Sequence, residues 1–245
     1  MKIEGETTTR LQISRTQALI EVFVIWAIVV GAAGFFYQLA WSGHVFYQNN
    51  LLALTTALLM YVPMAVFFIR QEPIDFLEKN LSQVLFSLGW LARVVFVLAP
   101  IVLFANHFYQ PWEFHVSWAG FRFYKSVFQY IPAGLNFLWP SILRNLVIAT
   151  GEEFFFRGYF QKRLHQVFGN SAQMCGFYSI KPLVLTSVIF ALSHSLITLQ
   201  WWHPFIFFPG LIFGWLREKT NGLVAPVFFH VLCNVFSEWV GVSYR

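Results

Sequence analysis

The chain has 245 residues, of which 58% are hydrophobic and only 11% are charged, whereas a soluble domain carries roughly a quarter charged residues. This composition predicts an integral membrane protein. The net charge of +5 does not indicate a nucleic-acid partner, because the basic residues fall at the ends of apolar segments, where membrane proteins carry their topology-setting charges.

Seven apolar windows meet the length that a spanning helix needs, which is about 20 mostly apolar residues. In chain order these windows are 19–41, 51–69, 81–104, 138–160, 183–199, 204–217 and 223–241. The aromatic-rich stretch between the third and fourth windows suits an interfacial or re-entrant segment and allows for an eighth, short one. The sequence therefore predicts an all-α transmembrane bundle with seven to eight membrane helices.

The distribution of Lys and Arg predicts the orientation. With a cytoplasmic N-terminus, the cytoplasmic side carries ten of them: Lys2, Arg10, Arg15, Arg70, Lys79, Lys162, Arg163, Lys181, Arg217 and Lys219. The opposite side carries three: Arg122, Lys125 and Arg245. This asymmetry follows the positive-inside rule. A short chain without an added domain is typical of prokaryotes, so we expect the cell membrane of a prokaryote, with the N-terminus in the cytoplasm.

The fourth window contains the stretch "ATGEEFFFRGYF" (149–160), which places three charges where lipid is expected. Each buried ionisable residue costs about 2.5 to 3.5 kcal/mol on the insertion scale, so such residues are candidates for function. On a helix, Glu153 and Arg157 stand four residues apart, the spacing of an ion pair. Glu152 is turned about 100° around the helix from Glu153, so Arg157 does not compensate its charge. A carboxylate left uncompensated in a low-dielectric site can act as a general acid or base.

Two further windows carry polar groups at a similar depth. His194 lies near the middle of its window, with Phe190 one helical turn before it on the same face. His230 and Asn234 are again four residues apart and point to the same side of a helix. We therefore expect three helices to bring polar groups together beside Glu152.

One carboxylate, two imidazoles and one amide can hydrolyse a peptide bond. A carboxylate and an imidazole hold and deprotonate water, while a second imidazole and an amide stabilise an oxyanion. A serine nucleophile is not expected, because Ser193 and Ser195 flank His194 and adjacent helical residues point in different directions.

The same side chains leave a zinc alternative open. Glu152, His194 and His230 form a His₂Glu set of the kind that leaves one position for water. Asn234 is a poor zinc ligand, however, and the HExxH signature is absent from the sequence. We favour hydrolysis without a metal cofactor.

The three segments resemble, in order and content, the CPBP family of intramembrane proteases, which includes type II CAAX prenyl endopeptidases and bacterial Abi proteins. The motifs of that family are EExxxR, FxxxH and HxxxN/D. This chain reads "EEFFFR" at 152–157, "FALSH" at 190–194 and "HVLCN" at 230–234, and the resemblance covers about residues 140 to 241.

The resemblance implies roles for individual residues. Glu152 with His194 would activate the hydrolytic water, and His230 with Asn234 would stabilise the oxyanion. Members of the family have been described both as metalloproteases and as glutamic proteases, so the resemblance does not decide between zinc and a bare water.

Glu153 and Arg157 match the remaining motif positions, and their expected ion pair gives them a supporting role. We divide the chain into N-terminal membrane helices without a recognisable motif (1–135) and a catalytic helical core (136–245), within one integrated membrane domain. The N-terminal part would shape substrate entry.

The expected substrate is a membrane-anchored protein or peptide, cut near its C-terminus or its anchor. Prenylated CAAX tails, peptide precursors and C-terminal sorting signals all fit, and a prokaryotic source favours the last two. Two other functions remain open: a small proton-coupled transporter that uses the buried Glu and His residues, and a catalytically silent immunity or scaffold protein. The two halves show no repeat of the kind typical of carriers.

Overall fold

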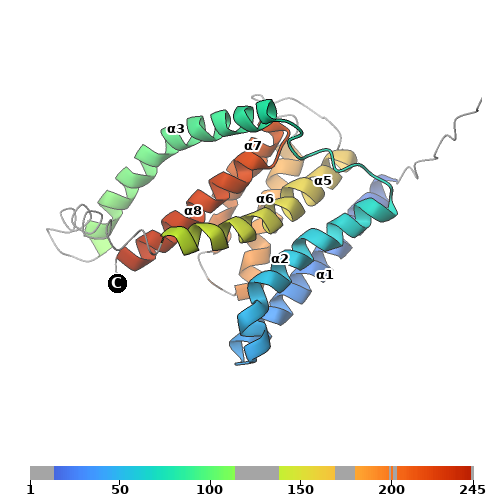
Figure 1. The fold of residues 1–245 in the computed structure, drawn as a ribbon, viewed down its shortest axis with the longest axis horizontal. Coiled ribbons are helices and arrows are strands. Elements are labelled where there is room, and N and C mark those ends of the chain that lie inside the picture. The colour runs from blue at the N-terminus through green and yellow to red at the C-terminus, as the bar shows by residue number, and fades with distance from the viewer. Residues whose placement is uncertain (1–13, 114–137, 169–179, 199, 201–202, 244–245) are drawn as a thin grey trace, which may run out of the picture.

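The structure is a computed structural model that describes residues 14–113, 138–168, 180–198, 200 and 203–243. All regular elements in these ranges are helical. In chain order they are α1 (Arg15–Trp41), α2 (Val45–Ile69), α3 (Leu81–Glu113), a helix at 138–153, η1 (Phe154–Phe160), α5 (Gln161–Phe168), α6 (Ile180–Thr198), η2 (His203–Ile206), α7 (Phe207–Thr220) and α8 (Val224–Ser243) (Figure 1). The predicted all-α class is confirmed.

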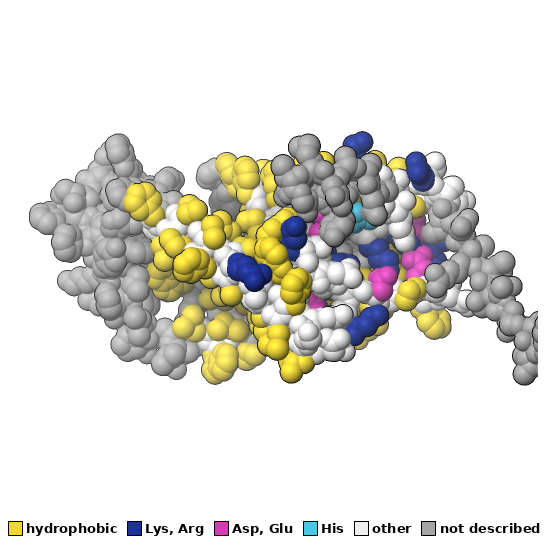
Figure 2. Space-filling view, turned by 90° about the horizontal axis from the view of Figure 1, so that it is seen from above, with side chains coloured by type: hydrophobic (Ala, Val, Ile, Leu, Met, Phe, Trp, Pro, Cys, Tyr) yellow, Lys and Arg dark blue, Asp and Glu magenta, His cyan; other side chains and the backbone are white. Residues whose placement is uncertain are grey.

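Four helices of the described residues are long and apolar enough to cross a membrane: Arg15–Trp41, Val45–Ile69, Leu81–Phe104 and Ile180–Thr198. A shorter apolar helix covers Val224–Trp239. Large hydrophobic side chains stand on the outside of these helices, as a lipid-facing surface requires. On the face drawn in Figure 2, hydrophobic side chains cover the left and centre, whereas most charged side chains in view gather toward the right.

Each predicted window falls on a helix, but several helices extend beyond the apolar residues. α1 begins four residues before its window because Ser14 caps it: the Ser14 Oγ accepts the Gln17 N–H at 3.2 Å, and the Gln17 side chain accepts the Ser14 N–H at 3.0 Å. The expected interfacial stretch after the third window lies largely outside the described residues, and its first part, up to Glu113, continues α3.

The segment with the two glutamates forms the centre of the bundle. The helix at 138–153 continues without a break into η1, a turn of π-helix, and then into α5. η1 packs against α2, α6 and α7, and its aromatic side chains are all buried: Phe154, Phe155, Phe156, Tyr159 and Phe160. This packing places the first motif in the protein interior, not on the lipid-facing surface.

α8, which carries His230, is held near both of its ends. The Glu78 carboxylate accepts the backbone N–H groups of Leu223 at 3.1 Å and Val224 at 3.0 Å, where a negative charge also complements the helix dipole. Near the other end, Glu238 accepts a hydrogen bond from Arg144 at 2.6 Å. These contacts fix α8 to the connection between α2 and α3 and to the 138–153 helix.

Candidate active site

Glu152 and Glu153 are the last residues of the 138–153 helix, directly before the π-helical turn. Single π-helical turns are rare and occur often at functional sites. The expected ion pair is present: Arg157 Nη1 donates to Glu153 Oε1 at 3.2 Å, and both side chains are completely buried. Arg157 Nη2 donates to the Gly210 carbonyl at 3.1 Å. The guanidinium is therefore committed to Glu153 and to the backbone of α7.

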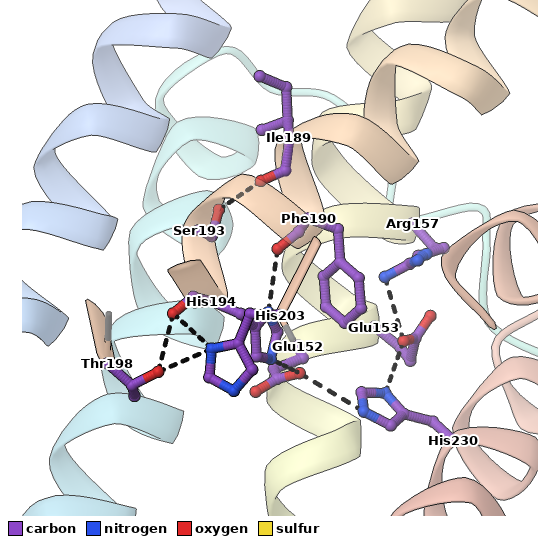
Figure 3. Close-up of polar contacts among 10 residues, drawn as sticks. All are labelled: Glu152, Glu153, Arg157, Ile189, Phe190, Ser193, His194, Thr198, His203 and His230. Atoms are coloured by element: carbon purple, nitrogen blue, oxygen red, sulfur yellow. Dashed lines mark hydrogen bonds and ion pairs between the residues drawn. The ribbon is translucent and has the colours of Figure 1, made fainter. Parts of the chain in front are cut away.

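Both motif histidines face the other glutamate. His194 Nε2 on α6 and His230 Nε2 on α8 each lie 3.6 Å from Glu152 Oε2 (Figure 3). This oxygen is buried, and none of the described residues donates a hydrogen bond to it. The structure thus brings together three of the residues singled out from the sequence. Glu152 forms no ion pair with Arg157 and stays open to a proton or a water molecule.

The second nitrogen of each imidazole is held by an acceptor. His194 Nδ1 lies 3.0 Å from the Phe190 carbonyl oxygen, and His230 Nδ1 lies 2.8 Å from Glu153 Oε1 (Figure 3). A carbonyl oxygen or a carboxylate can only accept, so Nδ1 carries the hydrogen in both rings. Glu153 therefore has a role beyond its ion pair, because it also orients His230. The spacing rules for a single helix could not reveal this contact.

Two phenylalanines pack against the polar cluster. The Phe190 ring meets the His194 ring edge to face at 4.6 Å, and the Arg157 guanidinium lies 4.3 Å from the Phe190 centroid. Phe213 of α7 stacks on His230 at 4.6 Å with an interplanar angle of 17°. Such contacts hold rings and cations in fixed orientations. The helical spacing indicated Phe190, but nothing in the sequence distinguishes Phe213 from the other phenylalanines.

A cavity of about 380 Å³ opens onto this cluster. Its walls come from α1, α2, the 138–153 helix and α6. Most of the lining side chains are aliphatic or aromatic, among them Val29, Val30, Ala33, Leu51, Leu52, Leu59, Ile148, Phe156 and Ile197. Glu152 and His194 face the cavity. The volume lies in the range of small-ligand sites, and the lining suits an apolar segment of a substrate.

The flanking serines are occupied by other contacts. The Ser193 hydroxyl donates to the Ile189 carbonyl at 2.7 Å and accepts the indole N–H of Trp26 at 2.8 Å. The Ser195 hydroxyl donates to the Ala191 carbonyl at 3.0 Å. Neither geometry provides a Ser–His pair.

Asn234 lies one helical turn after His230 on α8 and is partly exposed. Within the described ranges, its side chain makes no hydrogen bond to Glu152 or to either motif histidine. Its expected role at the oxyanion therefore remains a prediction.

His203 was not singled out from the sequence, but it lies beside the site. His203 Nδ1 lies 2.8 Å from Thr198 Oγ1 and 3.0 Å from the His194 carbonyl oxygen. The two imidazole centroids are 5.9 Å apart. His203 is the first residue of η2, and these contacts place its ring beside the last turn of α6 (Figure 3).

The donor atoms of Glu152, His194 and His230 are of the types that zinc binds. In the part of the chain that the structure describes, however, no three His, Cys, Asp or Glu side chains are placed so that they could hold a metal ion.

The fold and the cluster define the class of protein: a helical membrane protein with ionisable side chains around an internal cavity. Residues 134–236 match the family model described as type II CAAX prenyl endopeptidase Rce1-like. Over these residues, which make up less than half of the chain, the sequence is similar to that family, which confirms the resemblance seen in the three motifs and supports a membrane-embedded endopeptidase in general. No curated protein and no solved structure matches the chain.

Proposed function

We propose that the protein is an intramembrane endopeptidase that hydrolyses a peptide bond near the C-terminus or the membrane anchor of a partner protein or peptide precursor. The observation that carries the proposal is the approach of His194 and His230 to the same oxygen of Glu152, each at 3.6 Å, beside a cavity inside a membrane bundle. A buried carboxylate oxygen without a hydrogen-bond donor is costly, and a hydrolytic water gives it a use.

The charges of the cluster suggest where a proton resides. Glu152, Glu153 and Arg157 together carry one negative charge, and in a low-dielectric interior one added proton would make the cluster neutral. His230 lies between both carboxylates, 2.8 Å from Glu153 and 3.6 Å from Glu152. We assign the proton to His230, which leaves His194 neutral with an unprotonated Nε2 facing Glu152.

With these protonation states, each group has a role in the hydrolysis. Glu152, assisted by His194 Nε2, takes a proton from a water molecule while the oxygen of that water attacks the peptide carbonyl carbon. The Nε2–H of His230 stabilises the oxyanion, together with the Asn234 amide. The intermediate then collapses, the C–N bond breaks, and the proton held by Glu152 passes to the departing amine. Glu153 and Arg157 support the reaction because they hold His230 in its orientation.

The apolar cavity favours a substrate that brings an apolar, extended segment to the site. Sorting signals and peptide precursors carry such segments beside a membrane anchor. We propose these over prenylated tails, in the cell membrane of a prokaryote with the N-terminus of the chain in the cytoplasm.

The experiment uses the protein reconstituted in liposomes, together with membrane-anchored peptides encoded beside it in its genome. Digestion in ¹⁸O-labelled water, followed by mass spectrometry, should place one heavy oxygen in the new C-terminal carboxylate. We expect Glu152→Ala and His194→Ala each to lower kcat/KM at least about 100-fold, and His44→Ala, at the exposed start of α2, to leave it unchanged.

Cleavage at the wild-type rate by both site variants would sink the mechanism. Proton-coupled uptake of a solute that is lost in Glu152→Gln would instead favour a transporter. Tight binding of the peptide by wild type and site variants alike, without cleavage, would favour a scaffold or immunity protein.

The zinc-dependent form of the same protease is tested separately. The proposal without a metal cofactor expects activity to survive dialysis against a strong chelator, and elemental analysis to find less than one tenth of an equivalent of zinc. Loss of activity with the chelator and its recovery on adding zinc would overturn this part of the proposal and leave the protease assignment intact.

A further inference from the structure

A second and larger cavity, of about 730 Å³, lies at the end of the bundle where α1 begins. Its walls come from the connection between α2 and α3 (residues 70–80), from η1 and α5, and from the end of α7 with the turn that follows. Five basic side chains line it: Lys79, Arg157, Lys162, Arg217 and Lys219. Only two acidic side chains accompany them, Asp75 and Glu218, so the cavity has an excess of positive charge.

Both acidic side chains are already occupied. Asp75 pairs with the Lys162 ammonium at 2.7 Å. Burial alone would raise the pKa of Asp75, but Lys162 outweighs burial and holds this pKa below its ordinary value. Glu218 Oε1 accepts the Gln161 amide N–H at 3.0 Å and lies 3.1 Å from His165 Nε2. Each carboxylate thus has hydrogen-bonding partners of its own, and both also lie near enough to Arg217 to interact with its charge. The Glu218 Oε2 atom is buried and accepts no hydrogen bond from the described residues.

The basic side chains differ in how far they are occupied. Arg157 is committed to Glu153 and to the backbone of α7. Arg217 Nη1 donates to a neutral acceptor, the Asn221 side-chain oxygen, at 3.0 Å. Arg217 Nε is buried, and no group among the described residues accepts its hydrogen. A buried guanidinium N–H without an acceptor is costly, which points to an anionic ligand that the protein itself does not supply.

We propose that this cavity binds a phosphate-bearing anion, with Arg217, Lys79 and Lys219 as its ligands. Guanidinium and ammonium groups are the usual partners of phosphate in proteins, because their hydrogen bonds to it are charge-assisted. The cavity lies at a membrane-proximal end of the helices, where basic pockets can reach lipid head groups. The phosphate belongs either to an anionic phospholipid or to a soluble phosphate compound. The site is distinct from the Glu152 cavity and does not depend on proteolysis.

The test measures binding by the purified full-length protein in a phosphate-free maltoside detergent at constant ionic strength. The probes are short-chain phosphatidylglycerol, diacylglycerol with the same chains as the control without phosphate, and inorganic phosphate. The shift of the thermal midpoint with probe concentration gives each Kd. We expect saturable stabilisation by phosphatidylglycerol or by inorganic phosphate, and none by diacylglycerol.

The variants assign the binding to the cavity. Lys79→Ala and Lys219→Ala should each raise the Kd about tenfold, as loss of a charge-assisted hydrogen bond does. Lys181→Ala, an exposed lysine outside the cavity, should leave it unchanged. Saturation by phosphatidylglycerol alone identifies a lipid head group, and saturation by inorganic phosphate identifies a soluble ligand. No stabilisation by either phosphate probe, or equal Kd values in all three lysine variants, would overturn the proposal.

Discussion

Two clusters of charged side chains among the described residues differ in how completely their carboxylates are paired. The first, which we call the clamp cluster, joins α1, the α2–α3 connection, η1 and α5 through Glu21, Arg70, Glu72, Tyr159 and Arg163. Glu21 pairs with Arg70 and with Arg163 at 3.0 Å, and it accepts the Tyr159 hydroxyl at 3.2 Å. Both oxygens of Glu72 lie 2.8 Å from Arg163 Nη1. Each carboxylate of the clamp cluster has a cationic partner.

The second cluster surrounds Glu152. There, Glu153 is paired through Oε1 with Arg157 and His230, whereas Glu152 has only the two histidines at 3.6 Å. In both glutamates the Oε2 atom is buried and accepts no hydrogen bond from the described residues. Complete pairing is what a structural cluster needs, because an unpaired buried charge costs several kcal/mol. Incomplete pairing lowers stability and persists where function uses the group. The contrast supports the proposal that the second cluster carries out the chemistry, and it predicts that the first cluster contributes to stability.

The largest expected effect comes from the replacement of Glu152 by glutamine. Glu152→Gln should lower kcat/KM by about 10²- to 10⁴-fold, because a carboxamide cannot take a proton from water. It should leave the thermal midpoint unchanged or raise it, because it removes a charge whose Oε2 atom is buried and accepts no hydrogen bond from the described residues. Activity on a membrane-anchored peptide and thermal unfolding in the same detergent measure the two quantities.

Glu72→Gln is the matched control in the clamp cluster. It should lower the thermal midpoint, because Arg163 loses a charged partner, while kcat/KM per folded molecule stays at the wild-type value. If Glu152→Gln destabilises the protein as much as Glu72→Gln and retains activity, the distinction between the two clusters fails.

Much of the second cluster could be predicted from the sequence, because its members repeat at helical spacing within apolar segments. The Glu153–Arg157 pair and the Glu152–His194 partnership are both present as expected. The contact between Glu153 and His230 could not be predicted, since it joins residues 77 positions apart. It depends on how α8 packs against the 138–153 helix, which periodicity within one helix does not determine.

The fold, too, could be predicted only in part from the sequence. Apolar windows located the helices, because burial of backbone in lipid requires them. The π-helical turn at Phe154–Phe160 was not expected, since the π-helix has no strong composition signal. The clamp cluster was also missed: its charges lie at the ends of segments, where the positive-inside rule explained Arg70 and Arg163 as topology signals.

The second prediction breaks the clamp cluster from its cationic side. Arg163→Met should lower the free energy of unfolding by about 3 kcal/mol, because it leaves Glu21 and Glu72 without Arg163. Both glutamates are partly exposed, which keeps the loss at the lower end of the range for buried pairs. Reversible unfolding in mixed micelles measures it. A loss under 1 kcal/mol would show that Arg70 and water alone satisfy these carboxylates.

The third prediction concerns Gly158, which lies in η1 between Arg157 of the active-site cluster and Tyr159 of the clamp cluster. A Cβ at this position would lie 2.5 Å from the Phe76 ring, which is fully buried and cannot easily move. Gly158→Ala should therefore destabilise the protein by about 1–3 kcal/mol through overpacking. It should also lower activity, because the π-helical turn positions both clusters.

Gly89→Ala is the control for the effect of alanine itself. Gly89 lies within α3, and a Cβ there would have no neighbour within 4 Å. Alanine favours a helix over glycine by about 0.5–1 kcal/mol, so this variant should be neutral or slightly more stable. Equal unfolding free energies for the two alanine variants would contradict the proposed clash with Phe76.

The smallest effect is expected at Ser193, which lines the same cavity as Glu152 but belongs to neither charged cluster. Its hydroxyl accepts the Trp26 indole N–H and donates to the Ile189 carbonyl, so Ser193→Ala removes a polar link between α1 and α6. Loss of one such bond should cost about 1 kcal/mol of stability. Because the serine supplies no proton transfer to Glu152, kcat/KM should stay within about threefold of wild type. A fall in kcat/KM as large as that in Glu152→Gln would make Ser193 part of the chemistry. The incomplete pairing of Glu152 would then not be enough to identify the reactive group.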